Sequence, residues 1–287
     1  MEEKSQKLVS VGIPTYNRPE GLKRVLECIT NQSYKNLEII VSDNCSSYSE
    51  VVEVLLEFSA KDKRIKYFIQ KENKGVSFNF DFVLKKATGE YFMWASDDDE
   101  WENNFIEVCV NLLEENKNAG VAFSNIVNID SFNHIVRTYP SFKKFTIKNN
   151  FFRIIKYVLD PEILGKANII YGLYRIDVCK MAWNICPLNE KWGSDMAFVL
   201  ATLSRFHMCI DDRILFKKRI VKDSEDKNYA SKINILHPWR SIFPFDKFIE
   251  YTVEMKKGVS GTKYSFLVVF LLLIRLPQSF LNKYLGS

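Results

Sequence analysis

Short apolar runs alternate with amphipathic segments along the first 115 residues. The segments between the runs repeat apolar residues at helical spacing, which predicts helices from Pro19, from Ser49 and over 78–87, and a further helix over 104–115. This alternation predicts parallel βαβ units and a doubly wound α/β sheet. The runs have the length of buried strands and cover residues 8–14, 37–41, 65–69 and 91–94.

The pattern becomes less regular in the second half of the chain. We expect strands over residues 120–129 and 134–138 that pair antiparallel, and another strand over 169–175. Residues 195–203 predict a helix that begins at Asp195, where a carboxylate can cap free N–H groups.

The C-terminal part has a different composition. Residues 221–240 have little to bury and are expected to form a mobile loop. Residues 241–287 are expected to form a basic, apolar helical tail, because residues 255–287 hold five basic side chains and no acidic one around the apolar run 266–274. That run is too short to span a bilayer, which takes about 20 residues. Two interpretations stay open: peripheral contact with a membrane through residues 264–285, or burial against the domain.

The composition indicates a globular protein with a well-buried core, since 47% of its 287 residues are hydrophobic. The net charge of +5 arises from interspersed signs, which argues against a dedicated nucleic-acid-binding protein. The polar N-terminus leads directly into a strand, so we expect no secretory signal and a location in the cytosol. The six cysteines lack CxxC spacing, and we expect neither disulfides nor zinc.

An acidic turn follows the fourth apolar run. Residues 94–101 read WASDDDEW, which places Asp97, Asp98 and Asp99 where a buried strand meets solvent. Two carboxylates about 5 Å apart repel by about 3 kcal/mol at an effective dielectric near 20. Mg²⁺ or Mn²⁺ offsets such repulsion and is usually shared with phosphate oxygens of a substrate. The turn therefore predicts a divalent-metal site for a diphosphate substrate, with an acidic surface turn as the alternative.

Polar turns also follow the three earlier runs. In open α/β sheets, ligands bind outside the carboxyl ends of the strands. We therefore expect four polar turns to converge on one crevice; besides the acids they contribute Thr15, Tyr16, Asn17, Asp43, Asn44, Asn73, Lys74 and Gly75.

Several segments in the first 100 residues match a known family in order and spacing. They read VSVGIPTYNR at 9–18, LEIIVSDN at 37–44, NKG at 73–75 and ATGEY at 87–91, followed by the aspartates. In these segments the chain resembles family 2 glycosyltransferases with the GT-A fold. The resemblance is specific over roughly the first 130 residues and weaker to about residue 220.

The resemblance implies a GT-A domain over residues 1–220, with a nucleotide-sugar half over 1–130 and an acceptor half over 131–220. It implies a nucleotide-diphosphate sugar donor, with a UDP-sugar favoured, a divalent metal (Mn²⁺ or Mg²⁺), and inversion at the anomeric carbon by direct displacement.

The resemblance also implies roles for single residues. Asp99 is the expected metal ligand, with Asp97 or Asp98 at the ribose, but Ser96 stands where the family's pattern often begins with aspartate. The assignment of these roles to the three acids can therefore shift by one residue along the chain. The remaining implied contacts are Thr15, Tyr16 and Asn17 at the nucleotide, Asp43 at the base N–H, and Asn73 to Gly75 over the nucleoside.

An acceptor hydroxyl needs a carboxylate base within hydrogen-bond reach. Asp195 is the candidate, because WGSDM at 192–196 resembles the family's Glu-Asp base motif, with Ser194 in place of the usual glutamate. A position beside Trp192 favours a raised pKa for Asp195. Capping of the helix that begins there is the alternative role.

Other candidate groups carry weaker signals. Three histidines lack metal-ligand spacing, and three basic residues end an apparent strand where they can meet a diphosphate or remain solvated. The chain has no GxGxxG, GxxxxGK[ST] or GxSxG motif, which argues against dehydrogenase, P-loop and α/β-hydrolase functions. The histidines are His134, His207 and His237, and the basic residues are Lys217, Lys218 and Arg219.

Together these features predict a metal-dependent inverting glycosyltransferase at the cytosolic face of a membrane, acting on a surface polysaccharide or lipid-linked glycan acceptor. A noncatalytic nucleotide-sugar or glycan-binding module is one alternative. A nucleotidyltransferase is another, although that class favours a glycine-rich phosphate loop where this chain has residues 14–17, PTYN.

Overall fold

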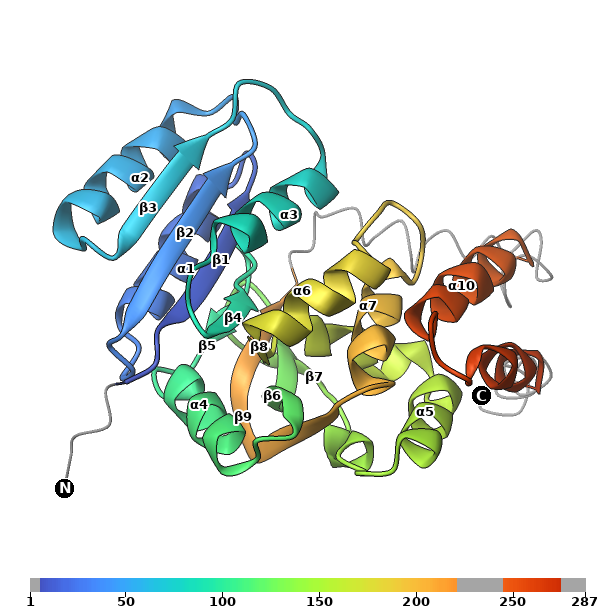
Figure 1. The fold of residues 1–287 in the computed structure, drawn as a ribbon. Helices are drawn as coiled ribbons and strands as arrows, with labels where there is room; N and C mark the ends of the chain where they lie inside the picture. The colour runs from blue at the N-terminus through green and yellow to red at the C-terminus, as the bar shows by residue number, and fades with distance from the viewer. Residues whose placement is uncertain (1–5, 221–244, 275–287) are drawn as a thin grey trace.

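The computed structural model describes residues 6–220 and 245–274 (Figure 1). Within these ranges the strands form one nine-stranded sheet in the order β3-β2-β1-β4-β8-β6-β9-β5, with β7 paired to β6. The expected loop over 221–240 and His237 lie outside the described residues.

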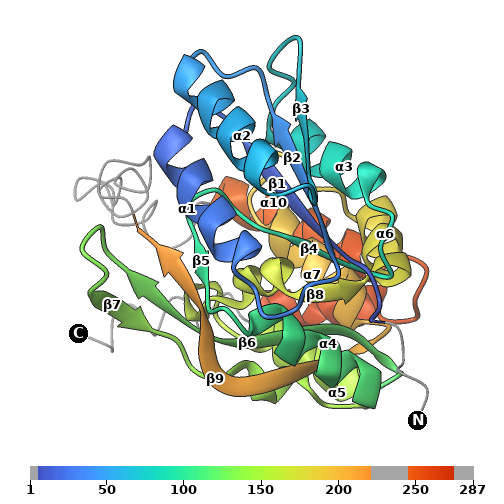
Figure 2. The same cartoon turned by 90° about the vertical axis from the view of Figure 1, so that its left-hand side faces the viewer.

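The first half of the sheet is parallel, as the alternating pattern predicts. Strand β1 pairs in parallel with β2 and β4, and β2 pairs in parallel with β3. Figure 2 shows α1 and α2 on one face of these strands and α3 on the other. The elements are β1 (Val9–Thr15), α1 (Pro19–Thr30), β2 (Leu37–Asp43), α2 (Ser49–Lys61), β3 (Ile65–Ile69), α3 (Val76–Lys86) and β4 (Tyr91–Trp94).

The second half of the sheet is mixed. Strand β6 pairs antiparallel with β7, as predicted, and with β8, but parallel with β9, while β5 pairs antiparallel with β9. The strands are β5 (Glu100–Trp101), β6 (Ala119–Ile129), β7 (Ile135–Thr138), β8 (Leu173–Arg175) and β9 (His207–Arg219). The helices are α4 (Phe105–Glu115), η1 (Phe142–Phe145), α5 (Asn150–Leu159), η2 (Glu162–Leu164), η3 (Lys166–Tyr171), α6 (Ile176–Ile185), α7 (Ser194–Leu203) and α10 (Phe245–Gly258).

The predicted strand over residues 169–175 is wrong in its first part. Only β8 is extended, and the residues before it form the 3-10 helix η3. Gly165 begins η3 with a left-handed φ of 82°, and the buried ammonium of Lys166 donates to the carbonyls of Tyr157 and Asp160 at 2.9 and 2.6 Å. The N–H of Gly172 and the Tyr174 hydroxyl donate to the Ile169 carbonyl at 2.9 and 2.8 Å, so this part of the backbone is satisfied without a sheet ladder.

Trp94 joins the two halves of the molecule. Its ring lies 4.8 Å from that of Phe92 and 5.4 Å from those of Trp183 and Phe198, measured between centroids. The indole N–H donates to the carbonyl of Phe80 at 3.1 Å. The strand that leads into the acidic turn is therefore fixed by helices from both halves.

The C-terminal helices pack on the domain by one face. Helix α10 lies against α7, with Tyr251 and Met255 fully buried. A last described helix over residues 265–274 buries Val268 and Leu272 but exposes Phe266 and Phe270. In the described ranges no helix has both the length and the apolar character needed to cross a bilayer.

Candidate active site

The turns after β1, β2 and β4 meet at one end of the sheet. Thr15 and Asp43 are paired in register at the ends of β1 and β2. The Thr15 hydroxyl donates to Asp97 Oδ2 at 2.7 Å, and the N–H of Asn44 donates to the Thr15 carbonyl at 3.0 Å. The convergence expected of these turns is confirmed for these three strands.

The turn before α3 joins the same cluster through Asn44. Its Nδ2 donates to Asn73 Oδ1 at 2.8 Å and to the Gly75 carbonyl at 3.1 Å, and its Oδ1 accepts from the Lys74 N–H at 3.1 Å. Gly75 precedes α3 with a left-handed φ of 84°. All four predicted turns therefore lie together, while their contact with a nucleotide stays a prediction.

Asp43 is held by the turn that follows it. The N–H of Ser46 donates to both carboxylate oxygens at 3.2 Å, and the Ser46 hydroxyl donates to Oδ1. Ser46 also accepts from the N–H of Asn17 at 2.7 Å, which links this turn to the one after β1. A carboxylate offers about four acceptor positions, so Asp43 keeps capacity for a further N–H donor. Tyr16 is 40% exposed at the rim.

Two of the three aspartates are buried, and the positive charges near them do not offset the effect of burial on their pKa. Asp97 and Asp99 are only 6% and 3% exposed. Burial, together with the charge of Asp98, raises the pKa of each to about 7. Arg18 opposes the shift at Asp97, and Lys218 opposes it at Asp99.

Arg18 supplies the main counter-charge to the first two aspartates. Its guanidinium pairs with Asp98 and lies 3.4 Å from Asp97 Oδ1. Although burial opposes the change, the charges of both acids raise the pKa of Arg18. The sequence reasoning did not single out this arginine; its position directly after Asn17, in the turn predicted to join the crevice, was the available signal.

The donor set fits a divalent cation shared with a diphosphate. In the part of the chain that the structure describes, no group of three or more His, Cys, Asp or Glu side chains forms a complete metal cage. Mg²⁺ commonly takes only one or two carboxylates and completes its shell with water and phosphate oxygens. Asp97 and Asp99 offer hard oxygen donors where positive charge is lacking, which is the property such an ion requires.

The end of β9 closes the site behind Asp99. The backbone N–H of Arg219 donates to Asp99 Oδ1 at 3.1 Å. The Arg219 side chain is held by Glu100, by Asn133 Oδ1 at 2.6 Å and by the Asp130 carbonyl at 2.7 Å. The guanidinium is therefore a structural anchor for the acidic turn.

The other two basic residues of this strand end differ in their partners. Lys217 pairs with Glu102 at 2.6 Å. Lys218 donates weakly to Asn168 Oδ1 at 3.4 Å, and its charge lowers the pKa of both Asp99 and Asp195. Lys218 is thus the member of this trio whose charge acts on both acids.

Asp195 lies at the second position of α7. Its Oδ1 accepts from the N–H of Met196 at 2.7 Å, while Gly193 occupies the N-cap position with a left-handed φ of 88°. Capping therefore uses one carboxylate oxygen. Burial raises the pKa of Asp195.

Tyr171 and Lys218 interact electrostatically with both Asp195 and the acidic turn. The pKa of the Tyr171 phenol is raised by burial and then by the charges of Asp99, Asp98 and Asp195. The phenol is therefore close enough to all three carboxylates for their charges to act on it. Tyr171 could not be singled out from the sequence, because it belongs to the apolar run over residues 169–175, which predicts a strand.

The start of α7 is supported by α10. The N–H of Trp192 donates to Glu250 Oε1 at 2.9 Å, and the Trp192 and Tyr251 rings lie 4.8 Å apart. Tyr251 also lies so close to Gly193 that a Cβ there would be 2.4 Å from a ring carbon. The C-terminal part of the chain thus sets the position of Asp195.

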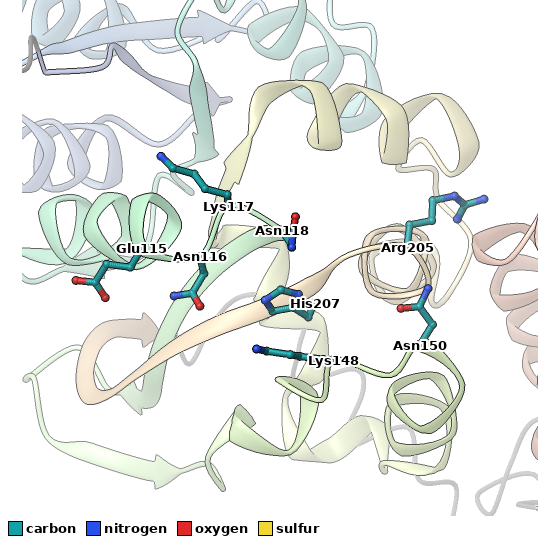
Figure 3. A pocket seen from close by; sticks show the side chains of 8 residues that line it. All are labelled: Glu115, Asn116, Lys117, Asn118, Lys148, Asn150, Arg205 and His207. Carbon is teal, nitrogen blue, oxygen red and sulfur yellow. The ribbon is translucent and has the colours of Figure 1, made fainter.

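The described histidines do not join this site. His134 lies 3.5 Å from Asp130 in an exposed pair. His207 lines a separate cavity of about 420 Å³ together with Lys148 and Arg205 (Figure 3). Burial, Arg153 and Lys148 lower the pKa of His207.

The sequence comparison places the chain in a family. The family model for glycosyl transferase family 2 matches residues 10–172. The chain belongs to glycosyltransferase family 2. The enzyme class and family expected from the sequence are thereby confirmed.

Curated relatives differ in how much of their length the chain covers. An uncharacterized glycosyltransferase of Rickettsia typhi is 37% identical over 92% of this chain and 79% of its own length. One of Rickettsia conorii is 29% identical over 91% of this chain but only 41% of its own length, so the chain spans about two fifths of that relative. A Campylobacter jejuni protein named GalNAc(5)-diNAcBac-PP-undecaprenol beta-1,3-glucosyltransferase is 41% identical over 32% of this chain and 30% of its own length.

Solved structures show that the fold is of the GT-A type, as expected. Residues 1–349 of S. aureus TarS superimpose with a TM-score of 0.62 at 16% identity, covering 98% of this chain and 92% of that one. A mannosyltransferase from Pyrobaculum calidifontis, solved with GDP-Man and Mn²⁺, gives a TM-score of 0.57 at 12% identity, covering 96% of this chain and 76% of that one.

Proposed function

We propose that this chain transfers a sugar from a nucleotide-diphosphate donor to an acceptor hydroxyl with inversion at the anomeric carbon. One observation carries the proposal: three strand-end turns meet at the turn that holds the buried Asp97 and Asp99, and the charges of Asp98, Asp99 and Asp195 act on the same Tyr171 phenol. The buried aspartates suit the binding of a charged donor, and Asp195 suits proton transfer.

On the donor side, Asp43 accepts from an N–H of the base. The turns before α1 and α3 enclose the nucleoside, Asp97 or Asp98 binds the ribose, and Asp99 holds the cation. When bound, Mn²⁺ or Mg²⁺ neutralises charge on the leaving diphosphate. The enclosing residues are Thr15, Tyr16, Asn17, Asn73 and Gly75.

On the acceptor side, Asp195 removes the proton of the attacking hydroxyl. The hydroxyl oxygen forms a bond to the anomeric carbon as the bond from that carbon to the diphosphate oxygen breaks. Burial raises the pKa of Asp195, which brings it closer to neutral pH and makes the carboxylate a stronger base. The positive charge of Lys218 keeps the ionised form accessible between the two sites.

The substrate classes follow from the protein's relatives. TarS has been solved with UDP-GlcNAc, which favours a UDP-sugar donor over the GDP-sugar of the mannosyltransferase structure. The name of the C. jejuni relative includes an undecaprenol-linked acceptor. A surface polysaccharide or lipid-linked glycan is the corresponding acceptor class here.

Calorimetric titration with a panel of nucleoside diphosphates and nucleotide sugars tests the donor assignment. We expect one nucleotide to bind more tightly with Mn²⁺ than without it, and Asp99→Ala to remove that enhancement. Glu57→Ala, which changes an exposed acid on α2, is the control and should leave binding unchanged. If no nucleotide binds with or without metal, the proposal is wrong.

Inversion is tested separately by the anomeric configuration of the product. NMR of the product formed from an α-linked nucleotide sugar should show a β-glycoside. Retention of the α configuration would contradict direct displacement.

A further inference from the structure

Two stretches without acidic residues meet at one corner of the molecule. Residues 131–159 contain six basic side chains and no acidic one, and residues 255–274 contain three basic and no acidic side chains. The first stretch includes α5, and the second includes the last described helix. Phe151 and Tyr264 bring them together, with ring centroids 6.4 Å apart. Lys143, Lys144 and Lys257 pair with carboxylates outside the two stretches, so the excess positive charge at this corner comes from the other basic side chains.

The helix over residues 265–274 is apolar on both faces. Its inner face is buried through Val268, Leu271 and Leu272. Its outer residues recur at i, i+4, i+7 and i+8, which is the spacing of one helix face. They are Phe266, Phe270, Leu273 and Ile274, which are 83%, 51%, 52% and 42% exposed.

Helix α5 extends this apolar surface. Phe151 and Phe152 lie in its first turn, are 41% and 57% exposed, and have ring centroids 5.5 Å apart. Phe151 contacts Tyr264 directly before the last helix. Contiguous exposed aromatic side chains of this kind mark an interaction surface, since monomeric soluble proteins rarely expose large apolar patches.

Basic side chains flank these aromatics in the sequence. Lys148, Lys156 and Lys263 are exposed, and none of them forms an ion pair with a carboxylate of the described residues. Lys148 also lines the cavity of about 420 Å³ in Figure 3, where Arg205 adds a second positive charge and Glu115 a negative one. The rim thus presents lysines free to bind anionic groups.

We propose that this aromatic-basic surface, formed by Phe151, Phe152, Tyr264, Phe266 and Phe270 with Lys148, Lys156 and Lys263, docks on an anionic membrane. Aromatic rings enter the boundary between headgroups and acyl chains, while lysines bind lipid phosphates. The combination of a basic rim with clustered phenylalanines fits an anionic lipid surface better than a second copy of this basic chain, which would bring like charges together.

Vesicle flotation of the full chain tests this surface. The wild type should bind vesicles that contain about 30% phosphatidylglycerol and should bind pure phosphatidylcholine vesicles at least tenfold less. The double variant Phe266→Ser/Phe270→Ser should bind phosphatidylglycerol vesicles at least tenfold more weakly, because two exposed aromatics no longer enter the interface. Lys148→Glu/Lys156→Glu should weaken binding at low salt and leave little further salt dependence.

Matched variants separate docking from folding. Leu56→Ser removes an apolar residue that is 53% exposed on α2, and should leave vesicle binding unchanged. Phe266→Trp should retain binding, because tryptophan suits the membrane interface. No binding of the wild type to anionic vesicles, or equal binding after the double serine change, would overturn the proposal. A concentration-dependent dimer that the serine variant loses, without vesicle binding, would assign the surface to a second copy instead.

This assay needs neither donor nor acceptor. Failure of vesicle binding therefore leaves the transferase proposal intact, and failure of sugar transfer leaves the docking surface intact.

Discussion

The two acidic parts of the site are built in opposite ways. Asp97 and Asp99 are crowded by Asp98 at the end of β4, and burial with this repulsion raises the pKa of each to about 7. Asp195 has its pKa raised by burial, while Lys218 lowers it. A crowded cluster of buried acids is stabilised by a cation, whereas a single, partly buried carboxylate is suited to take up a proton. The comparison assigns donor binding to the first and proton transfer to the second.

The two parts also differ in their supports. The acidic turn is fixed by the neighbouring strand ends, through Thr15 and the backbone of Arg219. Asp195 depends on α10, which contacts Trp192 and Gly193 at the start of α7. Changes in the C-terminal helices should therefore affect transfer before they affect donor binding.

The largest expected effect is that of Asp195→Asn on transfer. The amide cannot accept the acceptor's proton, so kcat should fall by about a hundredfold or more, while the donor KM changes little. Asp177→Asn is a matched control, because Asp177 occupies the same position in α6 and accepts the next N–H at 2.9 Å, but lies outside the site. Equal effects of the two changes, measured by initial rates, would reduce Asp195 to a helix cap.

The next effect is a pH-dependent change in stability on Asp99→Asn. Because its folded pKa is raised to about 7 from 3.8, Asp99 holds a proton between about pH 4 and 7 that the unfolded chain has lost. The free energy of unfolding of the metal-free protein therefore falls as pH rises through this window. The neutral amide introduced by Asp99→Asn removes this loss, so the variant should be more stable than the wild type by about 1–4 kcal/mol at pH 8 and similar to it near pH 4. Urea unfolding at both pH values measures the difference in the free energy of unfolding. A variant less stable than the wild type at pH 8 would contradict the claim that the acidic cluster lacks positive charge.

Two glycines with positive φ test the difference between the supports of the acidic turn and of Asp195. Gly193→Ala should cost about 1–3 kcal/mol, because its Cβ would lie 2.4 Å from Tyr251 in addition to the backbone strain. Gly75→Ala meets nothing within 4 Å, but its φ of 84° and ψ of 168° belong to a region that is almost exclusive to glycine, so the change should cost about 1–3 kcal/mol of backbone strain alone. Thermal unfolding measures both costs. In kinetics Gly193→Ala should lower kcat and Gly75→Ala should raise the donor KM; the reverse pattern would contradict the division of labour.

The smallest effect is expected from Tyr171→Phe. The charges of Asp99, Asp98 and Asp195 act on the phenol, and loss of one polar contact there is worth about 1 kcal/mol, or roughly a fivefold fall in kcat. Tyr174→Phe is the control, because its hydroxyl donates to the Ile169 carbonyl in the core at 2.8 Å. Equal kcat losses in the two variants would indicate that Tyr171 acts only through stability.

The parallel half was predictable because its information is local. Each strand of this half is an apolar run that ends at a polar turn, and the carboxyl ends of parallel strands meet by topology, so Thr15, Asp43 and Asp97 converge without further knowledge. Pro19 begins α1 as predicted, and the apolar stripe of that helix is buried.

The rest depends on contacts between distant residues. The burial of Lys166 in η3, the placement of Tyr171 between two acidic groups and the anchoring of Asp99 by Arg219, which lies 120 residues away in sequence, arise from packing that no local periodicity encodes. Asp195 itself was found through a family motif, and its support by α10 was not visible in the sequence.

The central claim is that the acidic turn binds the donor and Asp195 transfers the proton. Calorimetric titration of the donor with and without Mn²⁺, performed side by side on Asp99→Asn and Asp195→Asn, tests it most directly. We predict that Asp99→Asn loses the metal-dependent gain in affinity, while Asp195→Asn binds the donor as the wild type does. Wild-type donor binding by Asp99→Asn, together with lost binding in Asp195→Asn, would contradict the account.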